Sequence, residues 1–405
     1  MRHARQSVGG SAILVIALLS GCANLPERNP VPERLVPDAT IPGIPRARVY
    51  GDVPPPDLDA FFGQTNAELA AALPELVDTE HDYLVISGGG ANGAFGAGLL
   101  NGWTRAGTRP EFEIVTGISI GALIAPLVFL GPKYDAQLKE LFTQYSTDDL
   151  VTERGVLKII TGDSVASIEP MRASLEHVVD AAFMAEIAAE FRKGRQLLIG
   201  TTNLDAGRPV IWNLGRIASS GQPGALSLIH DVILASASVP VAFPPVMIDV
   251  EADGQTYDEM HVDGGVTFQL FLYPMGVNWR DVTERLEVRG RPRLYVIRNG
   301  HLAPDWAPVE RKITDIAGQT IFTLLSSTVL GDMYRVYLAA RRDGIDYHLA
   351  YIPAAFDRPS NEPFDSTYMQ ALFELGYDMA SGGYPWETTP PGYRPEPVQD
   401  LDIAQ

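Results

Sequence analysis

Two stretches decide the fold, YLVISGGGANG at residues 83–93 and FEIVTGISIGA at residues 112–122. Each begins with an apolar run typical of a buried strand, continues into a glycine-rich turn and ends at the apolar start of a helix. Glycine allows the backbone to turn sharply, because it has no Cβ to clash. The two stretches therefore predict two consecutive β-α units of a parallel sheet.

The alternation continues along the chain from residue 82 onward. Strands are predicted over residues 83–86, 114–116, 196–202, 209–213, 246–250, 257–262, 293–297 and 347–352. Helices are predicted over residues 95–103, 122–129, 171–182, 184–192, 230–236, 313–342 and 366–380, with one or two more in 58–76. This order indicates an α/β fold with a central, largely parallel sheet. The charges of Asp315, Asp332 and Arg335 argue against a membrane span in the long helix.

The second turn fits the G-x-S-x-G pattern of a nucleophile elbow. Gly117 and Gly121 let the chain pass directly from strand to helix, which leaves the Ser119 hydroxyl exposed at a helix N-terminus. A structural turn with a helix-capping serine is the alternative interpretation. The strand before the turn and the helix after it favour Ser119 as a nucleophile.

The first turn offers the consecutive backbone N–H groups of Gly88, Gly89 and Gly90 at another helix N-terminus, where negative charge is favoured. A serine nucleophile needs such donors, because the carbonyl it attacks becomes an oxyanion. The turn also fits the G-x-G-x-x-G pattern of dinucleotide-binding proteins, which requires an acidic residue at the end of the second strand. Glu111 and Glu113 precede or begin that strand, so we predict an oxyanion hole instead.

A candidate base is Asp263, which ends a strand and is followed by Gly264 and Gly265. With glycines behind it, this carboxylate can approach the elbow closely, and a serine nucleophile needs a base within hydrogen-bond reach. Taken alone, Asp-Gly is also a common turn dipeptide.

A catalytic triad in the order Ser, Asp, His requires a histidine after Asp263. His301 and His348 follow it, but neither lies in a loop suited to that role. His261 lies two residues before Asp263, on the same strand face, and is expected to be a structural histidine. The sequence contains no cluster with metal-ligand spacing, so no metal is expected.

The amino end has the pattern of a targeting segment. Arg2 and Arg5 precede an apolar run at residues 12–19 that is too short to span a bilayer. The run leads into LSGC at residues 19–22, which resembles the lipobox of bacterial lipoproteins. We therefore expect residues 1–21 to be a signal peptide and Cys22 to be lipidated. An ordinary secretory signal with an incidental cysteine is the alternative.

Composition completes the domain organisation. Residues 22–56 are rich in proline and predict an extended tether. We assign residues 57–390 to one globular domain, with its motifs within 82–270, and residues 391–405 to a C-terminal tail. Ala23 after the cysteine, in place of aspartate, resembles outer-membrane lipoproteins, which implies the outer membrane, facing the periplasm. The net charge of −19 without a basic patch argues against nucleic-acid binding.

Taken together, the motifs resemble those of the patatin-like phospholipase family. The motifs occur in the family's order as GGGANG at 88–93, GISIG at 117–121, ASASVP at 235–240, FPP at 243–245 and DGG at 263–265. The resemblance implies a three-layer α/β/α fold and hydrolysis of lipid acyl esters without calcium or another cofactor. It implies a dyad of Ser119 as nucleophile and Asp263 as base.

The resemblance also carries the supporting motif positions Asn92, Gly93, Gly117, Gly121, Gly264 and Gly265, and it assigns the oxyanion hole to Gly88, Gly89 and Gly90. One position departs from the family, because Asn92 stands where the family usually has arginine or lysine. A neutral side chain there makes a preference for anionic head groups less expected.

Three alternatives to lipid hydrolysis stay open. The same acyl-enzyme can pass its acyl group to another alcohol, which would make the protein an acyltransferase. A non-catalytic envelope lipoprotein can retain the fold, and a triad esterase would recruit a histidine. The apolar segments 155–192 and 313–342 are candidates for lining an acyl-chain groove.

Overall fold

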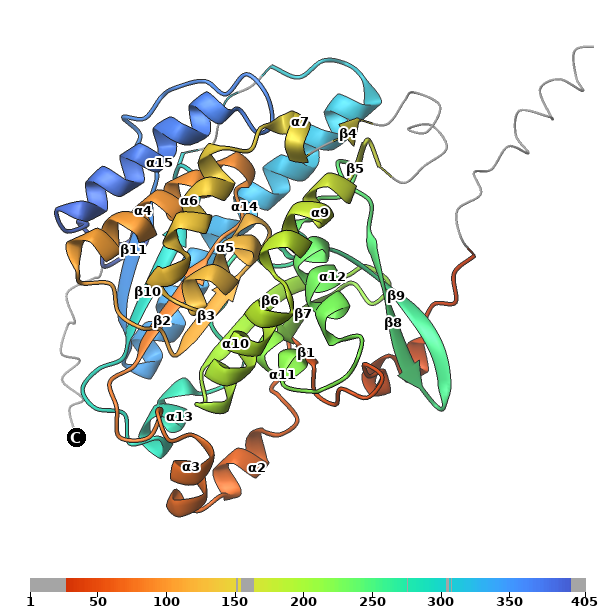
Figure 1. Ribbon diagram of the computed structural model, residues 1–405, viewed down its shortest axis with the longest axis vertical. Coiled ribbons are helices and arrows are strands. Elements are labelled where there is room, and N and C mark those ends of the chain that lie inside the picture. Colours follow the sequence, from red (N-terminus) through yellow and green to blue (C-terminus); the bar gives the residue numbers. More distant parts are fainter. Residues whose placement is uncertain are drawn as a thin grey trace, which may run out of the picture.

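The computed structural model describes residues 27–150, 152–153, 164–274, 276–303, 306 and 308–394. The expected signal peptide and Cys22 lie outside this part of the chain, as do residues 395–405. Most of the described strands form one central sheet (Figure 1). Its strands are β1 (Arg48–Tyr50), β2 (Asp82–Ile86), β3 (Ile114–Gly117), β6 (Gln196–Asn203), β7 (Arg208–Asn213), β8 (Val246–Ala252), β9 (Gln255–Asp263), β10 (Arg293–Arg298) and β11 (Asp346–Tyr351).

Helices surround this sheet. The α-helices are α2 (Leu58–Gly63), α3 (Asn66–Ala72), α4 (Gly93–Ala106), α5 (Ile120–Phe129), α6 (Asp135–Thr143), α7 (Thr147–Leu150), α9 (Glu169–Val178), α10 (Ala181–Arg192), α11 (Leu214–Ala218), α12 (Ala225–Ala237), α13 (Trp279–Arg285), α14 (Ile313–Asp343) and α15 (Ser366–Ser381). Short 3-10 turns are η1 (Glu33–Asp38), η2 (Gly90–Asn92), η3 (Pro132–Tyr134) and η4 (Gly264–Val266), and β4 (Thr152–Glu153) pairs with β5 (Ala166–Ser167). Among the described residues, no helix has the length and hydropathy needed to span a membrane.

The sheet has the order β1-β7-β6-β3-β2-β10-β11. Its strands β6, β3, β2, β10 and β11 are parallel neighbours, and β7 and β1 add antiparallel pairs at one edge. β9 pairs antiparallel with the end of β6 and with β8. The predicted α/β fold with a largely parallel sheet is confirmed. The topology places β2, β3 and β6 side by side, so the turns after β2 and β3 emerge at one edge.

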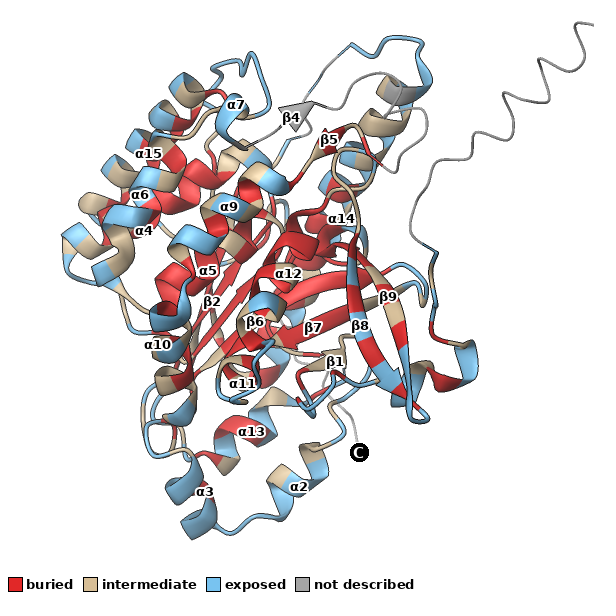
Figure 2. Ribbon diagram, turned by 45° about the vertical axis from the view of Figure 1, so that its right-hand side comes forward, coloured by how far each residue is buried: buried red, intermediate tan, exposed pale blue. Residues whose placement is uncertain are grey.

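Helices cover both faces of the sheet. On β2, Leu84 and Ile86 belong to the core cluster shared with α4, α5, α12 and α15, while Tyr83 and Val85 pack with α14 on the opposite face. This alternation follows from the period of two of a strand. Figure 2 shows the buried strands between the two helical layers. The expected three-layer α/β/α arrangement is therefore present.

The prediction of a tether over residues 22–56 is wrong for its described part. Leu35, Ile41 and Ile44 are buried in the main core, and β1 pairs with β7. Arg48 of β1 donates to Glu259 of β9 at 2.8 Å, and both side chains are almost fully buried. The prolines prevent regular helix but still allow the chain to bury apolar side chains between them. This segment therefore supports the strand that leads to Asp263.

Local features also differ from the sequence predictions, and two examples show why. The helix expected over 171–182 ends at residue 178, because the Asp180 side chain caps a new helix by accepting from the Phe183 N–H at 2.8 Å. α13 was not predicted, and its short length gives little periodicity to read.

The role of the first described segment can be tested with one buried and one exposed arginine. We expect Arg48→Met to lower the free energy of unfolding by about 3–5 kcal/mol, because Glu259 is left as a buried charge without its partner. Arg46→Met breaks only the exposed ion pair with Asp57, so a loss below about 1 kcal/mol is expected. Urea unfolding of both variants measures the difference. Equal effects would mean that the segment does not brace β9.

Candidate active site

Ser119 lies on a strained turn at the start of α5. Its backbone φ is +56° with ψ −124°, a conformation that a side-chain-bearing residue rarely adopts. A Cβ at Gly117 would overlap the carbonyl of Gly121, and one at Gly121 would overlap the carbonyl of Ile86. Both flanking glycines are therefore required by close backbone contacts. The geometry is that of the expected nucleophile elbow, with Ser119 partly exposed among buried neighbours.

A second serine, Ser236 of α12, holds the elbow in place, and sequence reasoning assigned it no role. The buried Ser236 hydroxyl of α12 accepts from the Ser119 N–H at 2.9 Å and donates to the Gly200 carbonyl at 2.6 Å. It therefore connects α12, the elbow and β6. Its sequence signal was its position in ASASVP, which the family resemblance included only as a motif.

The glycine turn after β2 lies directly beside the elbow. A Cβ on Gly88 would come within 3.0 Å of the Ser119 Cβ. Gly89 and Gly90 have positive φ angles of 154° and 56° and are exposed. The N–H groups of Gly88 and Gly89 donate to no other described residue. The turn thus presents unused donors next to the candidate nucleophile.

Asn299, which follows β10, fixes the position of this turn. Its Nδ2 donates to the Ser87 carbonyl at 3.0 Å, its backbone N–H donates to Ser87 Oγ at 2.9 Å, and its Oδ1 accepts from the Gly96 N–H at 3.2 Å. A Cβ on Gly89 would overlap the Asn299 carbonyl. Asn299 is buried, and sequence reasoning missed it. Its signal was a polar residue directly after a strand at the carboxyl edge of the sheet.

Gln269 fills the space between the two glycine motifs. Its side chain is buried, and it would obstruct a Cβ at either Gly88 or Gly265. Its Oε1 has no hydrogen-bond partner in the described part of the chain. Gln269 therefore packs against both loops, and no motif pointed to it.

Asp263 ends β9 beside Ser119. Its carboxylate is buried, and Oδ1 accepts from the Gly265 N–H at 2.7 Å. Oδ2 is buried without a hydrogen-bond partner among the described residues. Burial raises the pKa of Asp263 to about 7, although the Ser119 hydroxyl and the Gly265 N–H favour the charged form. A carboxylate with such a pKa is suited to accept a proton near neutral pH.

No described histidine is hydrogen-bonded to Ser119 or Asp263. His261 is fully buried between Thr201 at 2.9 Å and Glu259 at 3.1 Å, and burial lowers its pKa. It is the structural histidine that the sequence predicted. His348 of β11 stacks on Tyr295 of β10. Asp263 is therefore the candidate base beside Ser119.

The acidic residues weighed for a dinucleotide site serve other purposes. Glu111 pairs with Arg195 at 2.9 Å, and Glu113 accepts from the Asp82 N–H. Both lie at the amino ends of the strands, away from the glycine turn. In the described ranges, no group of three or more His, Cys, Asp or Glu side chains is arranged to hold a metal.

Asn92 has a specific partner. Its side-chain oxygen accepts from the Tyr368 hydroxyl of α15 at 2.6 Å. Arginine or lysine lacks an acceptor and is unable to make this bond. The neutral side chain at this position therefore links the glycine turn to α15.

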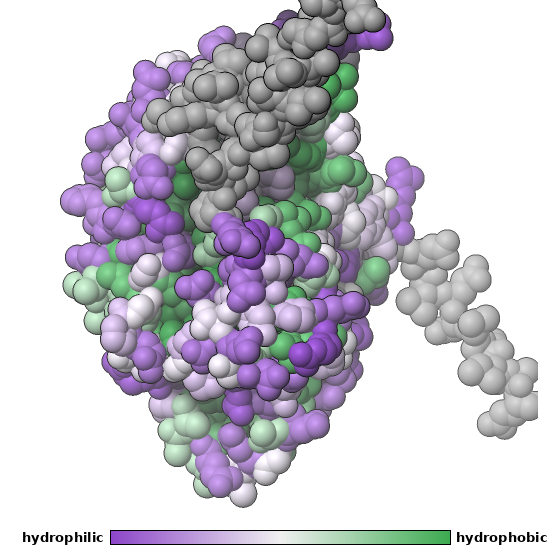
Figure 3. Space-filling model, turned by 90° about the vertical axis from the view of Figure 1, so that its right-hand side faces the viewer, coloured by the Kyte–Doolittle hydropathy of each residue, from purple (hydrophilic) through white to green (hydrophobic). Residues whose placement is uncertain are grey.

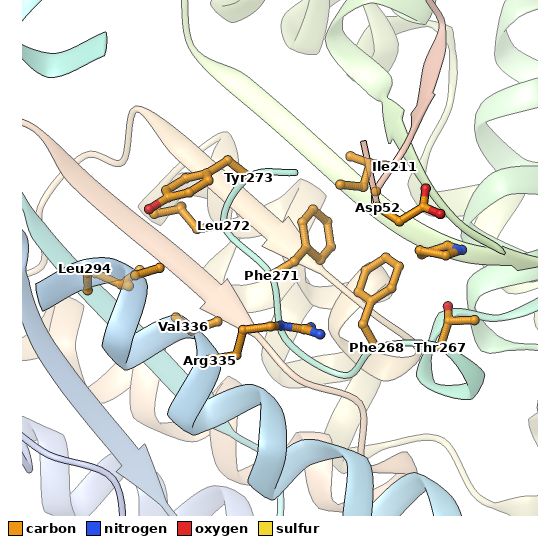
Figure 4. A pocket seen from close by; sticks show the side chains of 14 residues that line it. Asp52, Ile211, Thr267, Phe268, Phe271, Leu272, Tyr273, Leu294, Arg335 and Val336 are labelled. Carbon is orange, nitrogen blue, oxygen red and sulfur yellow. The ribbon is translucent and has the colours of Figure 1, made fainter. Parts of the chain in front are cut away.

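An apolar pocket lies on the face of the sheet that α14 covers, between α14 and β7 (Figure 4). Its lining includes Phe268, Phe271 and Val336, but neither Ser119 nor Asp263. Of the two segments proposed for an acyl groove, 313–342 contributes to this pocket, and the described part of 155–192 does not.

The buried carboxylate gives a test of stability. We expect Asp263→Asn to raise the melting temperature at pH 8, because the native protein there holds an ionised carboxylate out of water. The unfolded chain ionises with a pKa near 3.9, so the gain should shrink as pH falls from 7 to about 4, where native Asp263 retains its proton. Calorimetry of both proteins across this range checks the sign. A lower melting temperature of the variant at pH 8 would contradict it.

The comparison with known protein families covers the part of the chain that contains these motifs. Residues 84–272 match the family model described as Patatin-like phospholipase. No curated protein matches the chain. Similar solved structures include the crystal structure of VipD from Legionella pneumophila, with a TM-score of 0.39 and 14% sequence identity. The match covers 75% of this chain and 66% of the VipD chain, slightly less than two thirds of its length.

Proposed function

Residues 84–272 are a patatin-like phospholipase domain, and from that premise we propose that this protein is a serine hydrolase of lipid acyl esters. The family supports lipid acyl hydrolysis in general. The finer proposal is that Ser119 is the nucleophile, Asp263 is the general base, and Gly88, Gly89 and Gly90 form the oxyanion hole.

The reaction proceeds through an acyl-enzyme. Asp263 Oδ2 takes the proton of Ser119 Oγ as Oγ attacks the ester carbonyl. The carbonyl oxygen becomes an oxyanion and accepts hydrogen bonds from the glycine N–H groups. The ester C–O bond then breaks, and the alcohol leaves with the proton held by Asp263. Asp263 then takes a proton from water as the water oxygen attacks the acyl carbonyl. The bond between this carbonyl carbon and Ser119 Oγ breaks, Asp263 returns the proton to Oγ, and the fatty acid leaves.

One observation carries this proposal: a buried carboxylate with an unpaired oxygen lies beside a serine on a strained elbow. A carboxylate oxygen without a fixed partner is free to accept the serine proton, and residues with strongly shifted pKa values cluster at functional sites. Asn299 and Ser236 are positioning residues in this arrangement, because each holds a loop without reaching the reacting atoms. Acyl transfer to another alcohol would use the same acyl-enzyme, and product analysis with a competing alcohol separates the two outcomes.

A fluorophosphonate probe tests the nucleophile and the base together. We expect mass spectrometry to find the label on Ser119, no label in Ser119→Ala, and labelling at least about 100-fold slower in Asp263→Asn. The rate in the unmodified chain should rise with pH through about 7, since the base acts only when ionised.

The controls are His301→Ala and His348→Ala, which should label at the rate of the parent chain. Rapid labelling of Asp263→Asn would remove Asp263 as the base. A folded chain that does not label at all would favour the non-catalytic lipoprotein.

We further propose that the protein is held in the bacterial cell envelope by lipid attached to Cys22, at the outer membrane and facing the periplasm. The LSGC motif and the lack of any other cysteine support this. Radiolabelled palmitate should enter the parent protein and not Cys22→Ser, and only the parent should sediment with outer membranes. Equal incorporation into both would refute lipidation.

A further inference from the structure

The long helix α14 is longer than the strands that it covers. It connects β10 to β11, so it runs against the parallel strands and begins at the edge of the sheet where Ser119 lies. Thirty-one helical residues span about 46 Å, whereas a six-residue strand spans about 20 Å. Its buried apolar residues begin only at Leu325. The first half of α14 therefore extends past the sheet, as its upper end does in Figure 1.

The helix is anchored at the level of the candidate site. The buried Asp332 carboxylate accepts from the backbone N–H groups of Gln269 and Leu270, the latter at 3.1 Å. Gln269 in turn packs between the glycine turn and the turn after Asp263. Residues 313–324 thus project beyond the site at the sheet edge where its glycine donors are exposed. Residues 325–331 join them to the anchor, and among these Leu325 and Val329 are buried. We call residues 313–331 the overhang.

The overhang is almost without charge. Residues 316–331, IAGQTIFTLLSSTVLG, contain no ionisable side chain, although about a quarter to a third of a typical soluble surface is charged. Its exposed side chains include Ile313 at 89% and Leu324 at 61% exposure. The exposed large apolar residues at this end are Trp306, Val309, Ile313, Ile316, Phe322, Leu324 and Leu330. Figure 3 shows exposed hydrophobic residues toward the upper right of the face that it views.

Three threonine hydroxyls of the overhang are satisfied within the helix. Thr320 donates to the Ile316 carbonyl at 2.7 Å, Thr323 to Gln319 at 2.7 Å, and Thr328 to Leu324 at 2.8 Å. Such bonds let a threonine enter an apolar medium without losing a hydrogen bond to water. These hydroxyl protons are already donated within the helix, so they are not available to a polar protein partner. A lipid surface does not require hydrogen bonds from them.

We propose that the overhang, together with Trp306, docks onto a lipid surface of zero net charge and brings the candidate site to the esters there. The inference rests on the proposed function for its substrate. A chain of net charge −19 gains no attraction from anionic lipid, and an uncharged apolar helix matches a zwitterionic surface. Tryptophan is suited to the edge of such a surface, because its ring is apolar and its N–H is polar.

The test measures binding to phosphatidylcholine vesicles by flotation. It uses the chain from residue 23 onward, which keeps every described residue and lacks the apolar leader and Cys22, with Ser119→Ala to protect the vesicles. We expect binding that survives 0.5 M salt and is not strengthened by phosphatidylglycerol. Phe322→Ser/Leu324→Ser should bind about tenfold more weakly or worse, because two exposed apolar side chains are lost.

Leu338→Ser is the matched control. It removes an apolar side chain of 53% exposure from the same helix, beyond the Asp332 anchor, and should bind as the parent does. Equal binding by the double variant, absent binding by the parent, or binding that needs phosphatidylglycerol would overturn the proposal. A dimer that the double variant loses, seen by sedimentation without vesicles, would assign the overhang to a second copy of the chain instead.

A soluble short-chain ester separates this proposal from the proposed function. With Ser119 intact, the double variant should hydrolyse it at the parent rate, which also shows that the variant is folded. If the parent binds vesicles but hydrolyses neither ester nor lipid, the proposed function fails and the docking surface stands. If it hydrolyses the ester but does not bind vesicles, the docking surface fails alone.

Discussion

The rest of the site depends on a contact of backbone with backbone. The first turn of α5 lies so close to β2 and β3 that a Cβ at Gly117 or Gly121 would overlap a carbonyl oxygen. This approach forces Ser119 into its positive φ and puts it next to Gly88. The side chains of Ser236 and Asn299 hydrogen-bond to the two turns and fix a backbone conformation that the glycines make possible. The site is therefore built primarily from main-chain geometry.

Several of the groups gathered there lack hydrogen-bond partners. The buried Asp263 Oδ2 and the N–H groups of Gly88 and Gly89 have no partners in the described part of the chain. An unmade hydrogen bond at a buried group costs about 1–3 kcal/mol. The surrounding sheet and helices offset this cost through a large apolar core, which keeps the polar groups in place. An ester bound at this site would supply partners for the glycine N–H groups.

The sequence predicted the parts of this structure that are encoded locally. Strand, glycine turn and helix follow one another within a dozen residues around Ser119, so pattern and motif were sufficient there. The role of residues 27–56 was not predicted, because it depends on contacts with β7, β8 and β9 some 200 residues later. Asn299 and Gln269 belong to no motif, and only the packing of β10 and α14 against the site brings them to the loops. The candidate base Asp263 was suggested by its place in a motif, while its raised pKa follows from burial that no pattern reports.

The correction to the first segment shortens the distance that can separate the folded body from Cys22. Arg28 already belongs to the folded body, since it pairs with Asp205 at 2.6 Å and with Asp258 at 2.8 Å. Six residue steps separate it from Cys22, and they span at most about 20 Å, whereas a free tether to residue 56 would reach about 120 Å. With lipid at Cys22, as we propose, the folded body would be held close to the leaflet that contains the lipid. Its substrate esters would come from that leaflet, and a neighbouring membrane would lie too far away.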